Sequence, residues 1–119
     1  SNSIKIYQST YKIKGVKKYK RKKILAFAGI GNPENFFNLL KNSGLLIKDT
    51  ISFPDHYSYS KKEMENIILS AKEKKLEVIT TEKDYFRIKK LGFKKIHYIS
   101  VELKIINSKS FESEVLKNL

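Results

Sequence analysis

The chain has 119 residues, enough for one compact domain with a modest apolar core, and a formal net charge of +13. It has no cysteine and only two histidines, which excludes a disulfide framework, a thiolate metal site and an all-histidine metal site. No run of eighteen or more apolar residues is present, so the sequence predicts no membrane-spanning helix.

The positive charge is concentrated near the start of the chain. Residues 1–33 hold nine basic and no acidic side chains, and most of the nine lie within Lys12–Lys23. Such a stretch can attract nucleic acid or an anionic lipid surface by neutralising phosphates. Only Arg21 and Arg87 are arginines, however, and a lysine-rich surface favours solvation or diffuse attraction over specific phosphate recognition. We therefore expect a basic hairpin or linker segment at 1–23, followed by an α/β domain at 24–119.

The first predicted element is a peripheral strand, and the second is a buried strand. Apolar residues that alternate between Ile4 and Ile13 predict a hairpin or a peripheral edge strand running up to Gly15. Ile24–Ala28 is a short continuous apolar run, typical of a strand that is buried on both faces of a parallel sheet.

A helix and a strand should follow. Glu34–Asn42 is predicted as a helix, because Asn32 can cap it and Pro33 suits its first position. Leu45–Phe53 is predicted as the next strand, which Pro54 ends.

The same alternation continues along the chain. Ser60 and Glu63 match a capping box and predict a helix that runs to about Lys75. Val78–Thr80 is expected to be a short strand, followed by a helix that Thr81 caps.

The last predicted elements are a strand over Ile96–Val101, an extended piece around Leu103–Ile106 and a short helix over about Ser108–Leu116. Strands separated by single helices require right-handed crossovers. The predicted fold is therefore α/β with three layers: a mostly parallel, Rossmann-like sheet with helices on both faces.

Three predicted loops lie at one edge of this sheet. In an open parallel sheet, ligands bind outside the carboxyl ends of the strands, where loops lead into helix N-termini. The loops that share that edge are Gly29–Pro33, Phe53–Tyr57 and Thr80–Asp84. Gly29 and Gly31 would let the backbone approach an anion, but glycines also serve any tight turn. The chain has no Walker A motif, so we expect it to provide no nucleotide phosphate cradle of its own.

The other two loops carry ionisable side chains. Asp55 and His56 place a carboxylate beside the one side chain that titrates near neutral pH. Two interpretations stay open: His56 could be oriented by another carboxylate and transfer protons, or it could cap the next helix while Asp55 forms a turn. Glu82 and Asp84 lie in the first turn of a helix, where negative charge is favourable in any case. Lys83 opposes the helix dipole there, which favours a contact with a ligand.

Taken together, the three loops match a known family in their order, their spacing and their amino-acid sequences. The matching segments are Ala26–Phe37 (AFAGIGNPENFF), Phe53–Tyr59 (FPDHYSY) and Thr80–Asp84 (TTEKD). They closely resemble the C-terminal portion of the tetraacyldisaccharide 4'-kinase family, and the similarity extends over about residues 15–100. Many members continue the aspartate–histidine pair with a second histidine, where this chain has Tyr57.

The resemblance implies a phosphotransferase that uses ATP and Mg²⁺ to phosphorylate the 4' hydroxyl of tetraacyldisaccharide 1-phosphate in lipid A synthesis, in the cytoplasm at the inner membrane. In that family the P-loop and the metal-binding acids lie in an N-terminal half, absent from this sequence, which would be a partner of this segment. The histidine of the Phe-Pro-Asp-His motif pairs with an aspartate of that half and helps to deprotonate the sugar hydroxyl. That role would fall on His56, beside Asp55.

The resemblance also places a cleft for substrate or nucleotide at the three loops. Its candidate residues here are Gly29, Gly31, Asn32, Thr81, Glu82, Lys83 and Asp84. Without the other half, we expect this segment to hold neither ATP nor Mg²⁺ and to catalyse nothing alone.

Two rival interpretations come from other functional classes. The basic stretch suits an anionic membrane surface on the kinase interpretation, whereas a nucleic-acid-binding module would use it together with Tyr7, Tyr11 and Tyr19 as stacking groups. Nothing in the three loops requires nucleic acid, and none is expected as a partner. The other rival is a non-catalytic interaction domain, which a buried His56 bonded to its own domain's backbone would favour.

Overall fold

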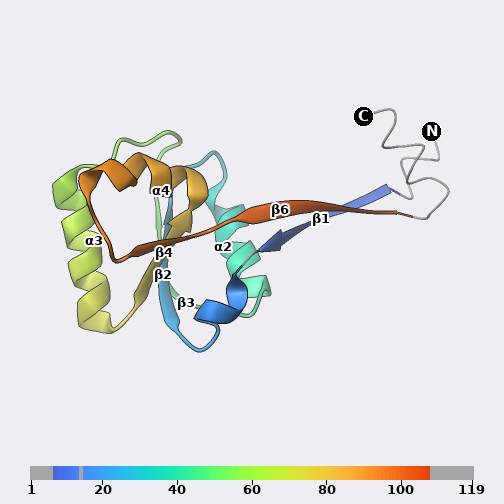
Figure 1. The fold of residues 1–119 in the computed structure, drawn as a ribbon, viewed down its shortest axis with the longest axis horizontal. Coiled ribbons are helices and arrows are strands. Elements are labelled where there is room, and N and C mark those ends of the chain that lie inside the picture. The colour runs from blue at the N-terminus through green and yellow to red at the C-terminus, as the bar shows by residue number, and fades with distance from the viewer. Residues whose placement is uncertain (1–6, 14, 108–119) are drawn as a thin grey trace. The chain divides into compact units, whose positions relative to one another are not determined.

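The computed structural model describes residues 7–13 and 15–107, and the side chains of residues 15–100. The described residues fall into two compact units: the larger runs from residue 13 to residue 100, and the smaller includes residues 7–12 and 101–107. In the second unit, β1 (Tyr7–Ile13) pairs with β6 (Val101–Asn107) in a two-stranded sheet (Figure 1). The strand expected before Gly15 is thus present, but its partner is distant in the sequence. The helix expected over Ser108–Leu116 lies outside the described residues.

The larger unit is built around a four-stranded parallel sheet with the strand order β3-β2-β4-β5. Its strands are β2 (Lys23–Ala28), β3 (Leu46–Ser52), β4 (Glu77–Thr81) and β5 (Ile96–Ile99). Helices α2 (Pro33–Asn42), α3 (Lys61–Lys74) and α4 (Glu82–Ile88) alternate with them along the chain, and a 3-10 turn, η2 (Lys89–Leu91), extends α4. This alternation confirms the predicted α/β fold.

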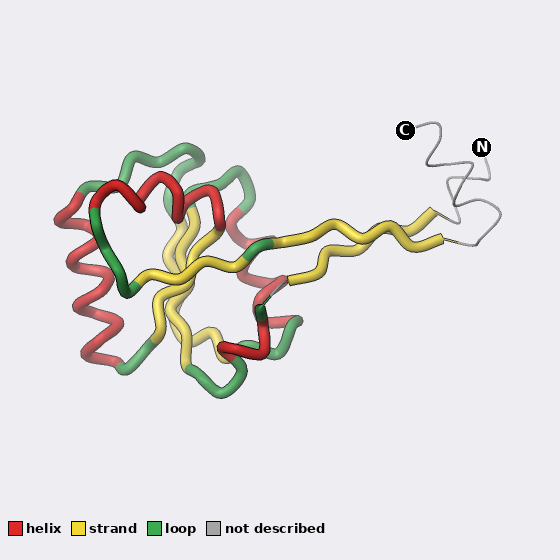
Figure 2. The backbone as a smooth tube through the Cα atoms, viewed as in Figure 1, coloured by secondary structure: helices red, strands yellow, loops and turns green. Residues whose placement is uncertain are grey.

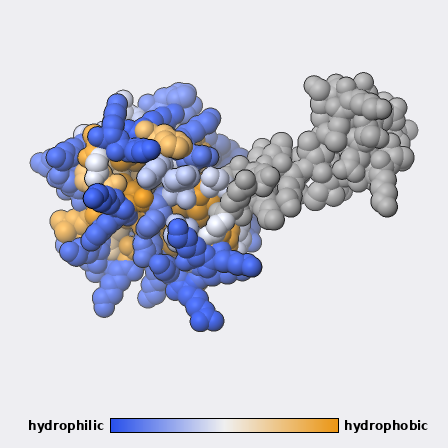
Figure 3. Space-filling model, viewed as in Figure 1, coloured by the Kyte–Doolittle hydropathy of each residue, from blue (hydrophilic) through white to orange (hydrophobic). Residues whose placement is uncertain are grey.

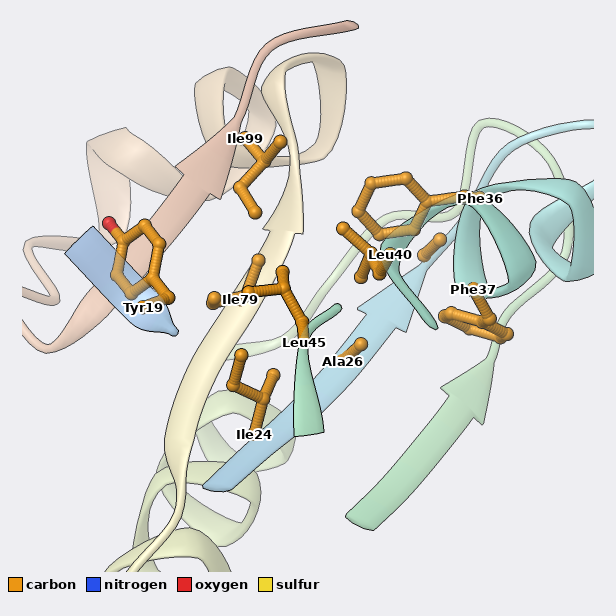
Figure 4. Packing of buried hydrophobic residues seen from close by; sticks show 10 residues of the cluster. Tyr19, Ile24, Ala26, Phe36, Phe37, Leu40, Leu45, Ile79 and Ile99 are labelled. Atoms are coloured by element: carbon orange, nitrogen blue, oxygen red, sulfur yellow. The ribbon is translucent and has the colours of Figure 1, made fainter. Parts of the chain in front are cut away.

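Successive residues of β2 point into two separate apolar cores. Ile24, Ala26 and Ala28 pack in the core formed with α2, whereas Leu25 and Phe27 pack in the core formed with α3 and α4. None of these five side chains is more than 2% exposed. Figure 1 shows α2 on one side of the sheet and α3 with α4 on the other, and Figure 4 shows the first core at close range. The sheet is therefore covered on both faces, as its continuous apolar strand predicted.

Side-chain caps determine where the helices begin. The Asn32 side chain accepts a hydrogen bond from a backbone N–H of the first turn of α2 at 3.3 Å. Ser60 and Glu63 form the predicted capping box of α3, with distances of 3.1 and 3.0 Å. Thr81 caps α4. Because each cap fixes the end of the preceding loop, these residues also shape the carboxyl edge of the sheet.

No helix in the described residues combines the length and the apolar character needed to cross a bilayer.

The basic segment before β2 is attached to the core. It contains a 3-10 turn, η1 (Val16–Tyr19), whose Tyr19 side chain is 5% exposed and packs in the same core as α2. The basic side chains around Tyr19 are exposed, and Figure 3 shows long hydrophilic side chains over the visible face. The described residues 15–23 therefore pack as part of the α/β unit.

Candidate functional site

The loops that follow β2 and β3 meet the end of β4 at the carboxyl edge of the sheet, as predicted (Figure 2). The third predicted loop, Thr80–Asp84, is a direct junction in the structure, because β4 ends at Thr81 and α4 begins at Glu82. The backbone N–H of Phe53 donates to the Ala28 carbonyl at 2.9 Å, and that of His56 donates to the Gly29 carbonyl at 3.1 Å. The Gly29 N–H in turn donates to the Asp84 carboxylate at 3.0 Å. The first loop is thus bonded to both of the others.

The Asp84 carboxylate lies at the centre of this edge and is fully buried. It accepts hydrogen bonds from the Gly29 N–H and the Tyr59 hydroxyl at 3.0 Å each, and from the Thr81 hydroxyl at 2.6 Å. Nη1 of Arg87 lies 3.4 Å from its Oδ1. A buried carboxylate is tolerated only when it is paired and hydrogen-bonded, so these contacts stabilise the arrangement as a unit. Burial, reinforced by the charge of Asp84, raises the pKa of the Tyr59 hydroxyl, which keeps it a donor.

Asp84 also accepts a hydrogen bond from the backbone amide that would face an anionic ligand in a sheet of this kind. The strand order reverses its direction between β2 and β4, and doubly wound sheets bind ligands at this switch point. Here the amide that would face a ligand, the Gly29 N–H, donates to Asp84 instead. Gly29, Thr81 and Asp84 are therefore brought together as predicted, but they satisfy one another.

His56 occupies an unusual backbone conformation in the second loop. It is the third residue of a turn closed by a hydrogen bond from the Tyr57 N–H to the Pro54 carbonyl at 3.1 Å. Its φ of 58° lies in the left-handed region, which costs a non-glycine residue about 1–2 kcal/mol. Glycine or asparagine would serve such a turn better, so the turn itself does not require histidine. The side chain is 77% exposed.

The imidazole of His56 is held by an arginine. Its Nδ1 lies 2.9 Å from Nη2 of Arg87, whose Nη1 donates to the Gly29 carbonyl at 3.0 Å. Oδ2 of Asp55 is 3.6 Å from Nε2, too far for a hydrogen bond. The alternative in which His56 caps the next helix is wrong, because Ser60 occupies that position.

The remaining candidates lie around the network without joining it. Gly31 and Asn32 are exposed, and the Asn32 side chain serves α2 as its cap. Glu82 and Lys83 are exposed in the first turn of α4, where Oε1 of Glu82 lies 3.4 Å from the Ser100 hydroxyl. Among the described residues, no group of three or more histidine or carboxylate side chains is placed to hold a metal ion.

Sequence reasoning missed two residues of the network, Arg87 and Tyr59. A signal for Arg87 was present, because it follows Asp84 by three residues on one helix face and is one of only two arginines. Tyr59 ends the FPDHYSY segment that matches the family, but nothing in that match indicated that its hydroxyl contacts Asp84. A further contact strengthens the second loop: the Tyr57 hydroxyl donates to Glu63, and this hydrogen bond raises the pKa of the tyrosine and lowers that of the glutamate.

A glycine pair tests how tightly the loops are packed. A methyl group added at Gly29 would lie 2.8 Å from the Tyr59 hydroxyl oxygen and 3.1 Å from the Pro54 carbonyl oxygen, whereas one at Gly31 would meet its nearest neighbour, Asp55, at 3.8 Å. We expect Gly29→Ala to lower the free energy of unfolding by about 1–3 kcal/mol, the usual cost of overpacking, and Gly31→Ala to change it little. Urea unfolding of both variants measures this. Equal midpoints would contradict close packing around Gly29.

Comparison with known proteins places this geometry in a family. The family model described as tetraacyldisaccharide-1-P 4'-kinase matches residues 3–119. The tetraacyldisaccharide 4'-kinase of Pelagibacter ubique (strain HTCC1062) is 42% identical over 93 residues, 78% of this chain and 30% of that protein. The enzyme of the same name from Rickettsia akari (strain Hartford) is 43% identical over 98 residues, 82% of this chain and 30% of that protein. The chain thus spans about 30% of the length of these relatives.

A solved structure agrees in fold. LpxK from Aquifex aeolicus, crystallised in complex with ATP, superposes with a TM-score of 0.57 over 94% of this chain and 35% of its own chain. The sequence identity there is 22%, so this likeness concerns the fold alone. Because the family model covers nearly the whole chain and the curated relatives are more than 40% identical, the chain belongs to the tetraacyldisaccharide 4'-kinase family.

Proposed function

We propose that this chain is the His56-bearing part of an ATP-dependent kinase that phosphorylates the 4' hydroxyl of tetraacyldisaccharide 1-phosphate in lipid A biosynthesis. Family membership and the names of the relatives support the reaction and its substrate. The observation that carries the proposal is the exposed imidazole of His56, held at the meeting point of three loops in a backbone conformation that histidine does not favour.

His56 supplies a proton-handling group on a well-supported loop. Phosphoryl transfer depends mainly on positioning and on charge neutralisation, and a sugar hydroxyl also needs a group that takes its proton. The exposed ring can reach groups outside this unit, which agrees with a pairing between His56 and an aspartate from the N-terminal half of the kinase. Asp55, half-exposed and 3.6 Å from Nε2, would add negative charge beside the ring.

The other candidate residues would line one side of the cleft between this region and the rest of the kinase. ATP and Mg²⁺ would be held by the P-loop half, which carries the phosphate-binding and metal-binding residues on the kinase interpretation. Exposed residues at the same edge, above all Lys83 in the first turn of α4, would face the anionic groups of nucleotide or substrate. The non-catalytic alternative is not favoured, since it expects a buried His56 side chain and the observed one is exposed.

The proposal predicts that His56→Ala lowers 4'-kinase activity by a factor of about 10² to 10⁴, the usual cost of losing a proton-transfer group. The assay needs a complete kinase that carries this region, for example the Pelagibacter ubique relative with the region exchanged. The control is His97→Ala, which removes the other histidine, on β5, and should leave activity nearly unchanged. Full activity of a folded His56→Ala variant would contradict the catalytic role.

We also propose that the basic side chains around Tyr19 bring the kinase to the anionic cytoplasmic face of the inner membrane. Lys17, Lys18, Lys20 and Arg21 are all exposed while Tyr19 anchors the segment in the core. Each lysine or arginine close to an anionic bilayer contributes about 1 kcal/mol to its attraction. A lipid substrate requires the enzyme to work at such a surface.

Binding of this chain to vesicles tests that surface. We expect it to bind vesicles of phosphatidylcholine with added phosphatidylglycerol at low salt, and to lose most of that binding when Lys17, Lys18, Lys20 and Arg21 are all changed to glutamine. A matched control changes Lys89, Lys90, Lys94 and Lys95, which are also exposed, to glutamine and so alters the net charge by the same amount. Equal losses in both variants, or tighter salt-dependent binding to an oligonucleotide than to vesicles, would count against a membrane-facing role.

A further inference from the structure

We infer that Arg87 is a positioning residue that fixes the neutral imidazole of His56 as the tautomer with its proton on Nε2. The inference deepens the proposed function, on which its catalytic significance rests. It follows from the contacts of Arg87 on one side of the ring and from the charge that lies on the other.

The hydrogen-bonding chemistry of arginine determines the direction of the contact. A guanidinium has five N–H donors and no acceptor. Nδ1 of His56 lies 2.9 Å from Nη2 of Arg87, so Nδ1 must accept the hydrogen bond through its lone pair. A ring protonated at Nδ1 would direct two donors at each other. The proton of the neutral ring is therefore on Nε2.

The guanidinium is itself held in place from its other side. Nη1 donates to the Gly29 carbonyl at 3.0 Å and lies 3.4 Å from Oδ1 of the buried Asp84. The Arg87 side chain is only 28% exposed, and its planar fork can satisfy both sides at once. Because Gly29 also accepts the backbone N–H of His56, one short cluster fixes both the backbone and the ring of that residue.

The opposite side of the ring favours the same tautomer. Oδ2 of Asp55 lies 3.6 Å from Nε2, so negative charge stands near the nitrogen that bears the proton. Nε2 is then a donor on an exposed ring, ready for an acceptor supplied by the rest of the kinase. A carboxylate there would be oriented by the Nε2–H and would itself take the proton of the sugar hydroxyl, because the neutral ring has no free lone pair once Nδ1 is engaged by Arg87. His56 would then assist proton transfer through that carboxylate.

Nitrogen NMR of this chain, labelled with ¹⁵N-histidine, tests the inference without any variant. At a pH at which the ring is neutral, long-range ¹H–¹⁵N correlations distinguish a protonated from an unprotonated ring nitrogen. We expect His56 to show a protonated Nε2 and an unprotonated Nδ1, with His97 as a second signal to be assigned separately by mutation. A His56 ring protonated mainly at Nδ1 would overturn the inference, because arginine cannot accept a hydrogen bond from it.

The variant Arg87→Met then tests whether the arginine is the cause. Methionine fills similar space but donates nothing, so both His56 nitrogens should shift toward the values of a mixture of tautomers. Arg21→Met changes the only other arginine, which is exposed on the basic segment, and should leave the His56 signals unchanged. The amide spectrum of each variant reports whether it is folded. An unchanged His56 tautomer in folded Arg87→Met would show that the arginine does not fix it.

Kinetics of the complete kinase separate this inference from the proposed function. Loss of a group that orients a metal-ligating histidine typically costs about 10- to 100-fold, and we expect a similar fall in kcat for Arg87→Met, with little change in KM for ATP. If His56→Ala lowers activity but Arg87→Met does not, the positioning role is wrong while the proposed function stands. If neither variant lowers activity, the proposed function is wrong, and the NMR result alone decides the tautomer.

Discussion

The buried carboxylate of Asp84 is the interaction on which the candidate site depends. It accepts hydrogen bonds from the Gly29 amide in the loop after β2, from the Tyr59 hydroxyl in the segment between β3 and α3, and from the Thr81 hydroxyl at the end of β4. Leaving any of these buried donors without a partner costs about 1–3 kcal/mol, so the loops are stable together rather than separately. Through Gly29 and Arg87 the same carboxylate reaches His56, the exposed group at the end of the chain of contacts.

This arrangement suits a region that completes a cleft instead of forming one. At the switch point of the sheet, the usual ligand position in this architecture, the Gly29 amide donates to an internal carboxylate. The exposed groups at this edge are the imidazole of His56 and the polar and charged residues beside it. On the proposed function, such a surface gains a catalytic use when another part of the kinase brings nucleotide and substrate to it.

Local signals in the sequence predicted most of the fold, because they act over a few residues. The capping box of Ser60 and Glu63 and the cap at Thr81 placed two helix starts, and the apolar run of β2 predicted a strand covered on both faces. The contacts that make the site join residues far apart, such as Gly29 with Asp84, 55 positions on, and His56 with Arg87, 31 positions on. No short-range pattern encodes these pairs, and the pairing of β1 with β6 was missed for the same reason.

Amide hydrogen exchange in the variant Asp84→Asn tests most directly whether one carboxylate holds the loops together. The variant keeps the size of the side chain but replaces an acceptor with a donor. We predict that the amides of Gly29 and His56 exchange about tenfold faster or more, while the Leu76 amide, bonded to the Ala71 carbonyl at 2.8 Å at the end of α3, keeps its protection. If Gly29 alone loses protection and His56 exchanges as before, the position of His56 does not depend on Asp84, and the central role of this carboxylate is contradicted.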